Sequence, residues 1–252
     1  RVLFRSGIST FLVTNAQYAE QIRDLAPVTQ LYISLDAPTK DLLKKVDVPL
    51  FKDYWERMLA SLDALAKKEH RTCIRLTAIK GMNMVHPENY AELIRRGDPD
   101  FLEVKAYMFI GASRQRLSIQ NMPWHEEVVA FAKEVVKHLP EYEICSEHIP
   151  SRVVMIAKKK YKHAEGWHTW IDFPRFADLA TSGGEVKTED YLKKTPTKTG
   201  LSGVITKPEG LKEKPTPKPA TVLAVDGNGA PVDEETEELE FWKDASRDDY
   251  LI

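Results

Sequence analysis

The stretch LYISLDAPT, residues 31–39, decides how this chain builds its sheet. Apolar residues alternate along it as in a strand packed into a core, but the strand ends on the hydroxyl of Ser34 and the carboxylate of Asp36. Side chains two positions apart project to the same face of a strand, so Ser34 and Asp36 point the same way. Two interpretations are open: both residues contact a ligand, or Asp36, ahead of Ala-Pro, shapes the turn through its own backbone.

Three more predicted strands share this polar ending. The four strands cover residues 10–14, 31–36, 73–79 and 101–109. Residues 50–68 carry apolar side chains at three- and four-residue steps, and residues 86–96 have a proline in their first turn, so both are predicted helices. Strands that alternate with helices predict a parallel sheet with right-handed crossovers. Ligands of such sheets bind at the carboxyl ends of the strands, where all four segments turn polar.

A second region follows the fourth strand. A helix entered through Pro123, with two glutamates in its first turn, precedes EYEICSEH (141–148) and SRVVMIAKKKY (151–161), which predict a hairpin or two adjacent strands. The aromatic stretch GWHTWIDFPRF comes next. From residue 195 onward, a proline–lysine linker and an acidic tail predict disorder, because neither offers a continuous apolar face.

Composition narrows the class of protein. The chain has 252 residues, a net charge of −2 and two cysteines, which excludes a disulfide framework and suits the reducing cytoplasm. No apolar run is long enough to cross a bilayer, so we expect no membrane partner. Residues 226–252 hold ten acidic residues against Lys243 and Arg247, which leaves the rest of the chain net positive and compatible with a nucleic-acid partner.

Seven segments, in order from residue 9 to residue 191, resemble the 4-demethylwyosine synthase family, the radical S-adenosylmethionine (SAM) enzymes of wybutosine synthesis in tRNA. They are FLVTNA, LYISLDAPTKDLLKKVDVPLFKDYWERML, RLTAIKGMN, FLEVKAYMFIG, MPWHEEVVAFA, YEICSEH and WHTWIDFPRF. The resemblance covers only the C-terminal part of the family and the chain has no initiator methionine, so we expect a C-terminal fragment.

The resemblance implies an α/β fold in three parts. Residues 1–122 would form a partial (β/α) radical-SAM barrel that lacks its first strands. Residues 123–194 would form a small α+β wyosine-base-formation region, and residues 195–252 the disordered linker and tail. The 4Fe–4S cluster would be bound by the missing N-terminal part, and FMN is possible in a missing flavodoxin-like domain. We therefore expect no metal ligands in this chain.

The implied reaction is a radical SAM lyase reaction on tRNA. Pyruvate-derived carbons are condensed with N1-methylguanosine in tRNA-Phe to give 4-demethylwyosine. The sequence does not identify the electron donor. Because three closely spaced cysteines are needed for the cluster and this chain has two distant ones, we expect the chain alone to be inactive.

The SAM site is expected at the strand ends. SAM carries an ammonium, a carboxylate, a ribose diol and a sulfonium, so its site needs hydroxyl, amide and carboxylate groups on rigid elements. Arg75 is expected to pair with the SAM carboxylate or with Asp36. The residues that the resemblance favours for SAM are Asn15, Ser34, Asp36, Arg75, Thr77 and Asn83.

Lys105 is the candidate catalytic residue. It lies in the largely apolar segment FLEVKAYMF, and desolvation favours the neutral amine of a lysine. A neutral amine can form a Schiff base with a keto acid such as pyruvate. The competing interpretation is an ordinary ion pair with Glu103, which projects to the same face.

Two groups of residues suit RNA. Trp124 and His125 stand at a predicted helix N-terminus, where free N–H groups favour a phosphate and an aromatic ring can stack on a base, although Trp124 can equally be a core anchor. A basic–aromatic run follows, which can contact a tRNA backbone or form a solvated face. Its members are Arg152, Lys158, Lys159, Lys160, Trp167 and Trp170.

Two other functions remain open at this point. One is a Schiff-base aldolase-like barrel that uses Lys105 without any cluster. The other is a non-catalytic tRNA-binding module that has kept the barrel scaffold.

Overall fold

The computed structural model describes residues 8–182 and 186–195. The chain divides into two compact units, Arg1–Thr216 and Pro217–Ile252, and every described residue belongs to the first. The disorder predicted from residue 195 onward lies outside the described residues except at Thr195, which is buried and accepts a hydrogen bond from the Thr169 amide at 2.9 Å. No helix in the described ranges is long and apolar enough to cross a membrane.

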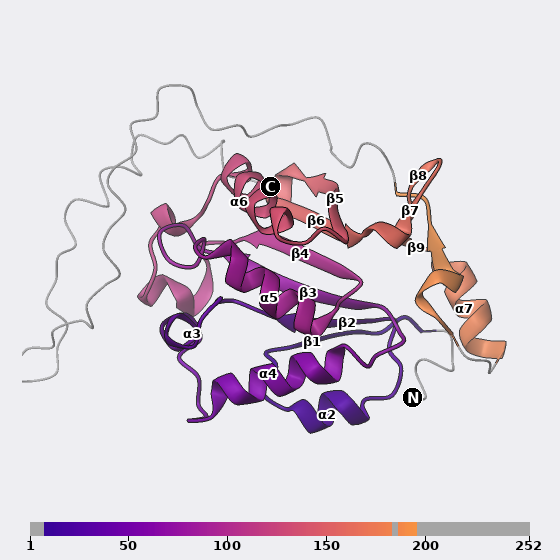
Figure 1. Cartoon of the computed structure of the whole chain (residues 1–252), viewed down its shortest axis with the longest axis horizontal. Helices are drawn as coiled ribbons and strands as arrows, with labels where there is room; N and C mark the ends of the chain where they lie inside the picture. Colours follow the sequence, from indigo (N-terminus) through magenta and orange to yellow (C-terminus); the bar gives the residue numbers. More distant parts are fainter. Residues whose placement is uncertain (1–7, 183–185, 196–252) are drawn as a thin grey trace, which may run out of the picture. The chain divides into compact units, whose positions relative to one another are not determined.

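A six-stranded mixed sheet forms the centre of the fold (Figure 1). Its order is β1-β2-β3-β4-β6-β5, in which β1 to β4 are parallel, β6 is antiparallel to β4, and β5 is antiparallel to β6. The predicted α/β fold, its four parallel strands and the adjacent pair that follows are confirmed. The strands are β1 (Phe11–Thr14), β2 (Gln30–Ser34), β3 (Thr72–Ala78), β4 (Phe101–Ala106), β5 (Tyr142–His148) and β6 (Val153–Lys158).

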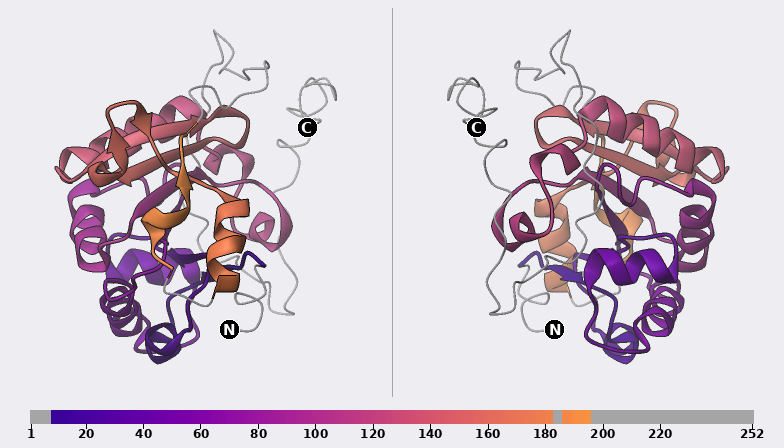
Figure 2. Two further views of the ribbon diagram at one scale, coloured as in Figure 1. Left: turned by 90° about the vertical axis from the view of Figure 1, so that its right-hand side faces the viewer. Right: turned by 90° about the vertical axis from the view of Figure 1, so that its left-hand side faces the viewer.

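Helices cover one face of this sheet (Figures 1 and 2). Their apolar sides share a buried core with Ile33 of β2, Leu76 of β3 and Val104 of β4. Burial of each such side chain contributes about 1.5–3 kcal/mol, so this core is the main source of stability. The helices are α2 (Ala19–Asp24), α3 (Lys40–Asp47), α4 (Tyr54–Leu65), α5 (Pro87–Gly97) and α6 (His125–Lys137).

The sequence patterns predict α4, α5 and α6 but not α2 or α3. With 6 and 8 residues, α2 and α3 are too short to display several turns of apolar periodicity. A local signal for α3 does exist, because the Thr39 hydroxyl accepts a hydrogen bond from the Leu42 amide at 3.4 Å and caps the helix. The helix ends at Val48, whose φ of 47° is left-handed.

The other face of the sheet is apolar where the parallel strands begin and polar where they end. At the beginning, Cys73, Phe101, Ala157 and Tyr161 form a small buried cluster. The C-terminal segment covers this end of the sheet, and Figure 1 shows α7 (Phe173–Ser182) there, away from α3. The short strands of this segment are β7 (Lys162–His163), β8 (Gly166–Trp167), β9 (Trp170–Ile171) and β10 (Leu192–Lys193).

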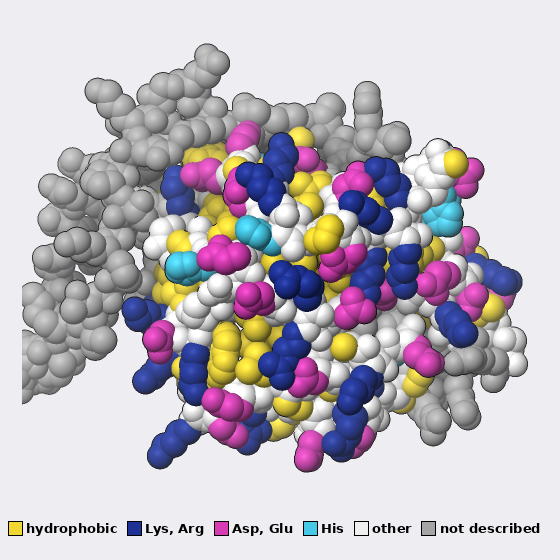
Figure 3. Space-filling view, viewed as in Figure 1, with side chains coloured by type: hydrophobic (Ala, Val, Ile, Leu, Met, Phe, Trp, Pro, Cys, Tyr) yellow, Lys and Arg dark blue, Asp and Glu magenta, His cyan; other side chains and the backbone are white. Residues whose placement is uncertain are grey.

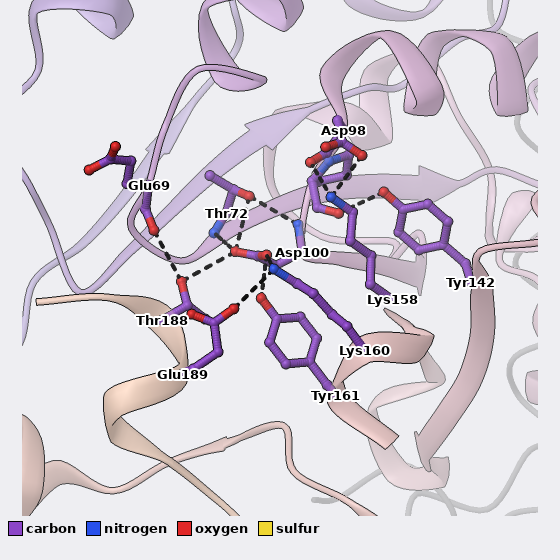
Figure 4. Close-up of polar contacts among 11 residues, drawn as sticks. Glu69, Thr72, Asp98, Asp100, Tyr142, Lys158, Lys160, Tyr161, Thr188 and Glu189 are labelled. Carbon is purple, nitrogen blue, oxygen red and sulfur yellow. Dashed lines mark hydrogen bonds and ion pairs between the residues drawn. The ribbon is translucent and has the colours of Figure 1, made fainter. Parts of the chain in front are cut away.

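A buried carboxylate, Asp100, ties the C-terminal segment to the sheet (Figure 4). It accepts hydrogen bonds from the Thr72 amide at 3.1 Å and from the Thr188 hydroxyl at 3.4 Å. It also accepts one from the Tyr161 hydroxyl and lies 3.4 Å from the Lys160 ammonium. Burial, followed by the negative charge of Asp100, raises the pKa of Tyr161, so the phenol stays protonated and donates. One side chain thus joins the start of β3 to η4 (Lys159–Tyr161) and η5 (Thr188–Tyr191).

Candidate active site

A cavity of about 380 Å³ lies at the carboxyl ends of β1 and β2. It brings together three of the residues predicted for SAM, Asn15, Ser34 and Asp36. Its lining contains both polar and apolar side chains, as a ligand with both kinds of group requires. The remaining lining residues are Gln17, Tyr18, Leu43, Val46, Asp47, Pro49, Leu50, Phe51 and Arg116.

Asp36 lines the cavity and is hydrogen-bonded to the neighbouring strand. Its Oδ1 accepts a hydrogen bond from the Thr77 amide at 2.9 Å. Burial raises the pKa of Asp36, while the hydrogen bonds from Thr77 and the charge of Arg75 oppose that rise. The bond to Thr77 joins the end of β2 to β3, so Asp36 does more than shape its own turn.

Asn83 does not line the cavity, but it is hydrogen-bonded to the backbone of Asp36 and Thr77. It is fully buried, and its amide nitrogen donates to the carbonyls of Asp36 at 2.8 Å and Thr77 at 2.7 Å. Its Oδ1 accepts from the Ile79 amide at 2.6 Å. These three bonds occupy the Asn83 side chain with protein groups, so its observed contacts position Asp36 and Thr77.

Sequence reasoning missed Asp47 and Arg116, which also line the cavity. Asp47 is the last residue of α3 and is exposed. Partial removal from water by surrounding protein atoms, then the charge of Asp36, raise the pKa of Asp47 to about 7, and Arg116 opposes this. Arg116 donates to the Val46 carbonyl at 3.3 Å. The sequence does contain a signal for this region, the helix-capping residue Thr39. It predicts a helix that starts after β2, and Asp47 lies at the end of that helix.

Arg75 has a partner that the sequence did not indicate. Its Nε lies 3.0 Å from Oε1 of Glu103, and its Nη2 donates to Oε2 at 3.2 Å. The guanidinium also lies over the Tyr32 ring, 4.6 Å from its centroid. Arg75 and Glu103 are register partners on β3 and β4, which explains why the two side chains meet.

Lys105 lies next to this pair. It is the register partner of Thr77, and it shares a sheet face with Arg75 and Glu103. The side chain is half-buried, and among the described residues none forms a hydrogen bond or ion pair with its ammonium. Because Glu103 is engaged by Arg75, the anticipated Lys105–Glu103 pair does not form. The amine of Lys105 is thus available to a ligand.

Trp124 and Arg152 meet at the same edge of the sheet, and the buried His125 follows Trp124 in the chain. The Arg152 guanidinium lies 4.7 Å from the centroid of the Trp124 ring, and the Arg152 carbonyl accepts from the Ala106 amide at the end of β4. His125 Nε2 lies 2.9 Å from Oε2 of Glu147. Arg152 adopts a left-handed φ of 49°, a conformation that costs a non-glycine residue about 1–2 kcal/mol.

The lysine run lies at the opposite edge, where the parallel strands begin. Lys158 pairs with Asp98 at 2.7 Å, Lys160 pairs with Glu189 at 3.1 Å, and Lys159 donates to a backbone carbonyl. Trp167 packs against the small apolar cluster beside these lysines, and Trp170 is exposed. Basic and acidic side chains are likewise interspersed over the face in Figure 3. The structure therefore does not bring this run together with Lys105.

The described residues fit SAM better than they fit an iron–sulfur cluster. No three His, Cys, Asp or Glu side chains within residues 8–182 and 186–195 gather as metal ligands. Burial raises the pKa of both free thiols, that of Cys145 to about 11, which disfavours the thiolates that a cluster needs. The hydroxyl, amide and carboxylate groups of the cavity are those that SAM requires.

Comparisons with known proteins give a consistent result. A family described as wyosine base formation matches residues 96–158. SAM-dependent tRNA 4-demethylwyosine synthase TYW1 of Xenopus laevis is 50% identical over 203 residues, which are 78% of this chain and 28% of that protein. The human protein is 49% identical over 203 residues, with the same coverage, and that of Schizosaccharomyces pombe is 44% identical over 204 residues.

Two solved structures are also similar. One is described as TYW1 with a lysine-pyruvate adduct bound; it is 34% identical and has a TM-score of 0.57 over 63% of this chain and 50% of that chain. The other, archaeal TYW1, is 33% identical with a TM-score of 0.52 over the same shares. The chain spans 28% of the length of the first curated relatives that it matches.

Proposed function

The matched part of this chain belongs to the tRNA 4-demethylwyosine synthase family, and from that premise we propose that it supplies the SAM pocket and the pyruvate-binding lysine of such an enzyme. The complete enzyme would be a radical SAM lyase that condenses pyruvate-derived carbons with N1-methylguanosine in tRNA-Phe. When bound together with a 4Fe–4S cluster, SAM would supply the radical for that reaction. The ligands of the cluster, and any FMN, would lie outside the described residues.

The main support for this proposal is that no described residue forms a hydrogen bond or ion pair with the Lys105 amine. The Lys105 amine is half-buried, no described residue engages it, and a neutral lysine amine can attack a ketone. The attack of Nζ on C2 of pyruvate forms a C–N bond, and loss of the ketone oxygen as water leaves an iminium. The TYW1 structure described with a lysine-pyruvate adduct supports the assignment of this chemistry to the family fold.

For SAM we propose the cavity residues Asn15, Ser34 and Asp36 as contacts. Thr77 and Asn83 would act through Asp36, because both are hydrogen-bonded to its carboxylate or carbonyl. Contact between Arg75 and SAM remains a prediction. For tRNA we propose the corner formed by Trp124, His125 and Arg152, which lies at the same sheet edge as Lys105.

Reductive trapping tests the proposed function. The chain is incubated with radiolabelled pyruvate and cyanoborohydride, whose hydride reduces the iminium to a stable secondary amine. We expect close to one label per chain, on the peptide that contains Lys105, and none when cyanoborohydride is omitted. Absence of label on that peptide would contradict the proposal.

Salt-dependent binding of tRNA-Phe separates the two groups of RNA candidates. We expect Arg152→Gly to weaken binding by about tenfold, since stacking contacts contribute about 1–3 kcal/mol per base. Glycine accepts the left-handed backbone at this position, although the variant loses the hydrogen bond from Arg152 Nη1 to the Pro123 carbonyl. Lys159→Ala tests the lysine run, where loss of one phosphate contact would lower the salt slope by about one. If Arg152→Gly bound tRNA-Phe with unchanged affinity, the proposal that Trp124, His125 and Arg152 contact the tRNA would be wrong.

A further inference from the structure

We propose that Leu50 enters the tRNA beside the target nucleotide and separates the target base from its neighbour, while three lysines on either side of it hold the flanking phosphates. The inference rests on the proposed function, because it takes tRNA as the substrate. It does not depend on which residue binds pyruvate. It assigns to the RNA a surface that contains none of the residues predicted from the sequence to bind RNA.

The loop of residues 48–51 borders the cavity and carries an exposed apolar side chain. Pro49, Leu50 and Phe51 all line the cavity. Leu50 is 97% exposed, more than any other large apolar residue in the described ranges. Phe51 is half-buried, because its ring packs edge-on against Tyr18 and the Arg57 guanidinium lies 4.0 Å from its centroid. The loop is thus anchored at Phe51, whereas Leu50 has almost no contact with the protein.

The backbone just before Leu50 is strained and held in place. Val48 has a φ of 47°, and a left-handed conformation is a genuine outlier for a β-branched residue. Such strain persists only where the surrounding structure fixes it, and it concentrates at active sites and ligand clamps. The Val48 amide donates to the Lys44 carbonyl at 3.2 Å, and the Arg116 guanidinium donates to the Val46 carbonyl at 3.3 Å. These two bonds fix the end of α3, from which the loop starts.

Three exposed lysines flank the 48–51 loop in the chain. Lys44 and Lys45 lie in the last turn of α3, and Lys52 follows the loop directly. No described residue forms a hydrogen bond or ion pair with their ammonium groups. Lys158 and Lys160, at the other edge of the sheet, are both paired with carboxylates. The cations that remain available to the phosphates of an RNA strand are therefore those beside the cavity.

An exposed apolar side chain among unpaired lysines fits RNA that has a displaced base. Enzymes that act on a base first take it out of its stack, and several nucleic-acid-binding proteins insert leucine or another apolar wedge between neighbouring bases. Leu50 is exposed and apolar, and it is anchored through Phe51, as a wedge requires. Because the residues of this loop also line the cavity, a base displaced by Leu50 lies next to the proposed SAM site.

A fluorescent base distinguishes the wedge from simple binding. The anticodon stem-loop of tRNA-Phe is made with 2-aminopurine next to N1-methylguanosine, because stacking quenches the fluorescence of 2-aminopurine. We expect the fluorescence to rise when the unaltered chain binds, and we expect Leu50→Ala to lose this rise. Since Leu50 is 97% exposed, its replacement leaves the packing of the protein unchanged. Phe173→Ala is the matched control, because it removes an exposed apolar side chain at the start of α7, away from α3, and should keep the rise (Figure 1).

Salt-dependent binding of the same stem-loop tests the lysines. Replacement of Lys44, Lys45 and Lys52 by alanine together should lower the slope of log affinity against log salt concentration by about two, since each phosphate contact to a single strand contributes about 0.7. Lys67→Ala provides the control. Lys67 is an exposed lysine just beyond the end of α4, and its replacement should leave the slope unchanged.

The results separate this inference from the proposed function. An unchanged fluorescence rise in Leu50→Ala, or an unchanged salt slope in the triple lysine variant, would overturn the inference and leave the proposed function intact. Concentration-dependent dimers that Leu50→Ala abolishes would also overturn it, because the 48–51 loop would then belong to an interface between two copies of the chain. If the unaltered chain does not bind the stem-loop, the inference and the tRNA part of the proposed function are both wrong.

Discussion

Replacement of Lys105 by alanine is expected to reduce pyruvate trapping on this chain to background. The reason is geometric as well as chemical. Lys105 offers an amine that no described residue engages, whereas Lys158, on the neighbouring strand, pairs with Asp98 at 2.7 Å at the other end of the sheet. Arginine cannot replace it, because the guanidinium stays protonated and does not attack a ketone. The measurement is the amount of label per chain after reduction.

Two controls show whether the loss is specific. Lys158→Ala should retain full labelling, since its amine is tied to Asp98. Lys105→Ala should change the free energy of unfolding by no more than about 0.5 kcal/mol, because it breaks no ion pair or hydrogen bond among the described residues. Full labelling of Lys105→Ala, or a large loss of stability without loss of label, would show that Lys105 is a structural residue.

Replacement of Asp100 by alanine is expected to destabilise the fold by about 3–5 kcal/mol. Asp100 is buried and accepts bonds from the Thr72 amide, the Thr188 hydroxyl and the Tyr161 phenol. Its removal leaves buried donors without an acceptor, each at a cost of about 1–3 kcal/mol. Because these donors belong to three separate segments, the C-terminal segment should detach from the sheet. Urea unfolding followed by circular dichroism gives the free energy directly.

Asp98 provides the matched control for this experiment. It lies two residues away and also pairs with a lysine, Lys158, but its side chain is 56% exposed. Asp98→Asn keeps a residue that tolerates the left-handed φ of 42° at this helix end. We expect it to cost less than about 1 kcal/mol, because the Asp98 carboxylate is exposed and Lys158 keeps its hydrogen bond to the Asp98 backbone carbonyl at 3.0 Å. Equal destabilisation by the two replacements would mean that the burial of Asp100 is not what matters.

The four parallel strands could be predicted because their apolar and polar residues are local signals. Each strand is short, strongly apolar and followed by polar residues, and the amphipathic helices between them leave a parallel sheet as the simplest connection. The carboxyl-end location of Asn15, Ser34 and Asp36 followed from the same topology, and the structure places all three around one cavity. The short helices α2 and α3 were not predicted, because they span too few turns to show a helical period of apolar residues.

Partners across the sheet could not be predicted in the same way. The sequence predicts the face to which a side chain projects but not the register between strands. The register decides which side chains lie opposite each other. Arg75 was expected to meet Asp36 or a ligand, and Lys105 to meet Glu103. The observed register instead pairs Arg75 with Glu103 and places Thr77 opposite Lys105. The result is a lysine whose amine remains available.

The stretch at residues 31–39 shows the same division. By itself the sequence determined that a buried strand ends on Ser34 and Asp36, because alternation and a following proline are properties of neighbouring residues. Only the tertiary structure decided that Asp36 accepts the Thr77 amide at 2.9 Å and lines a cavity with Asp47 and Arg116. The physical reason is that a hydrogen bond needs its donor and acceptor at a fixed distance. Packing of segments that are 41 residues apart sets that distance, and no local pattern records it.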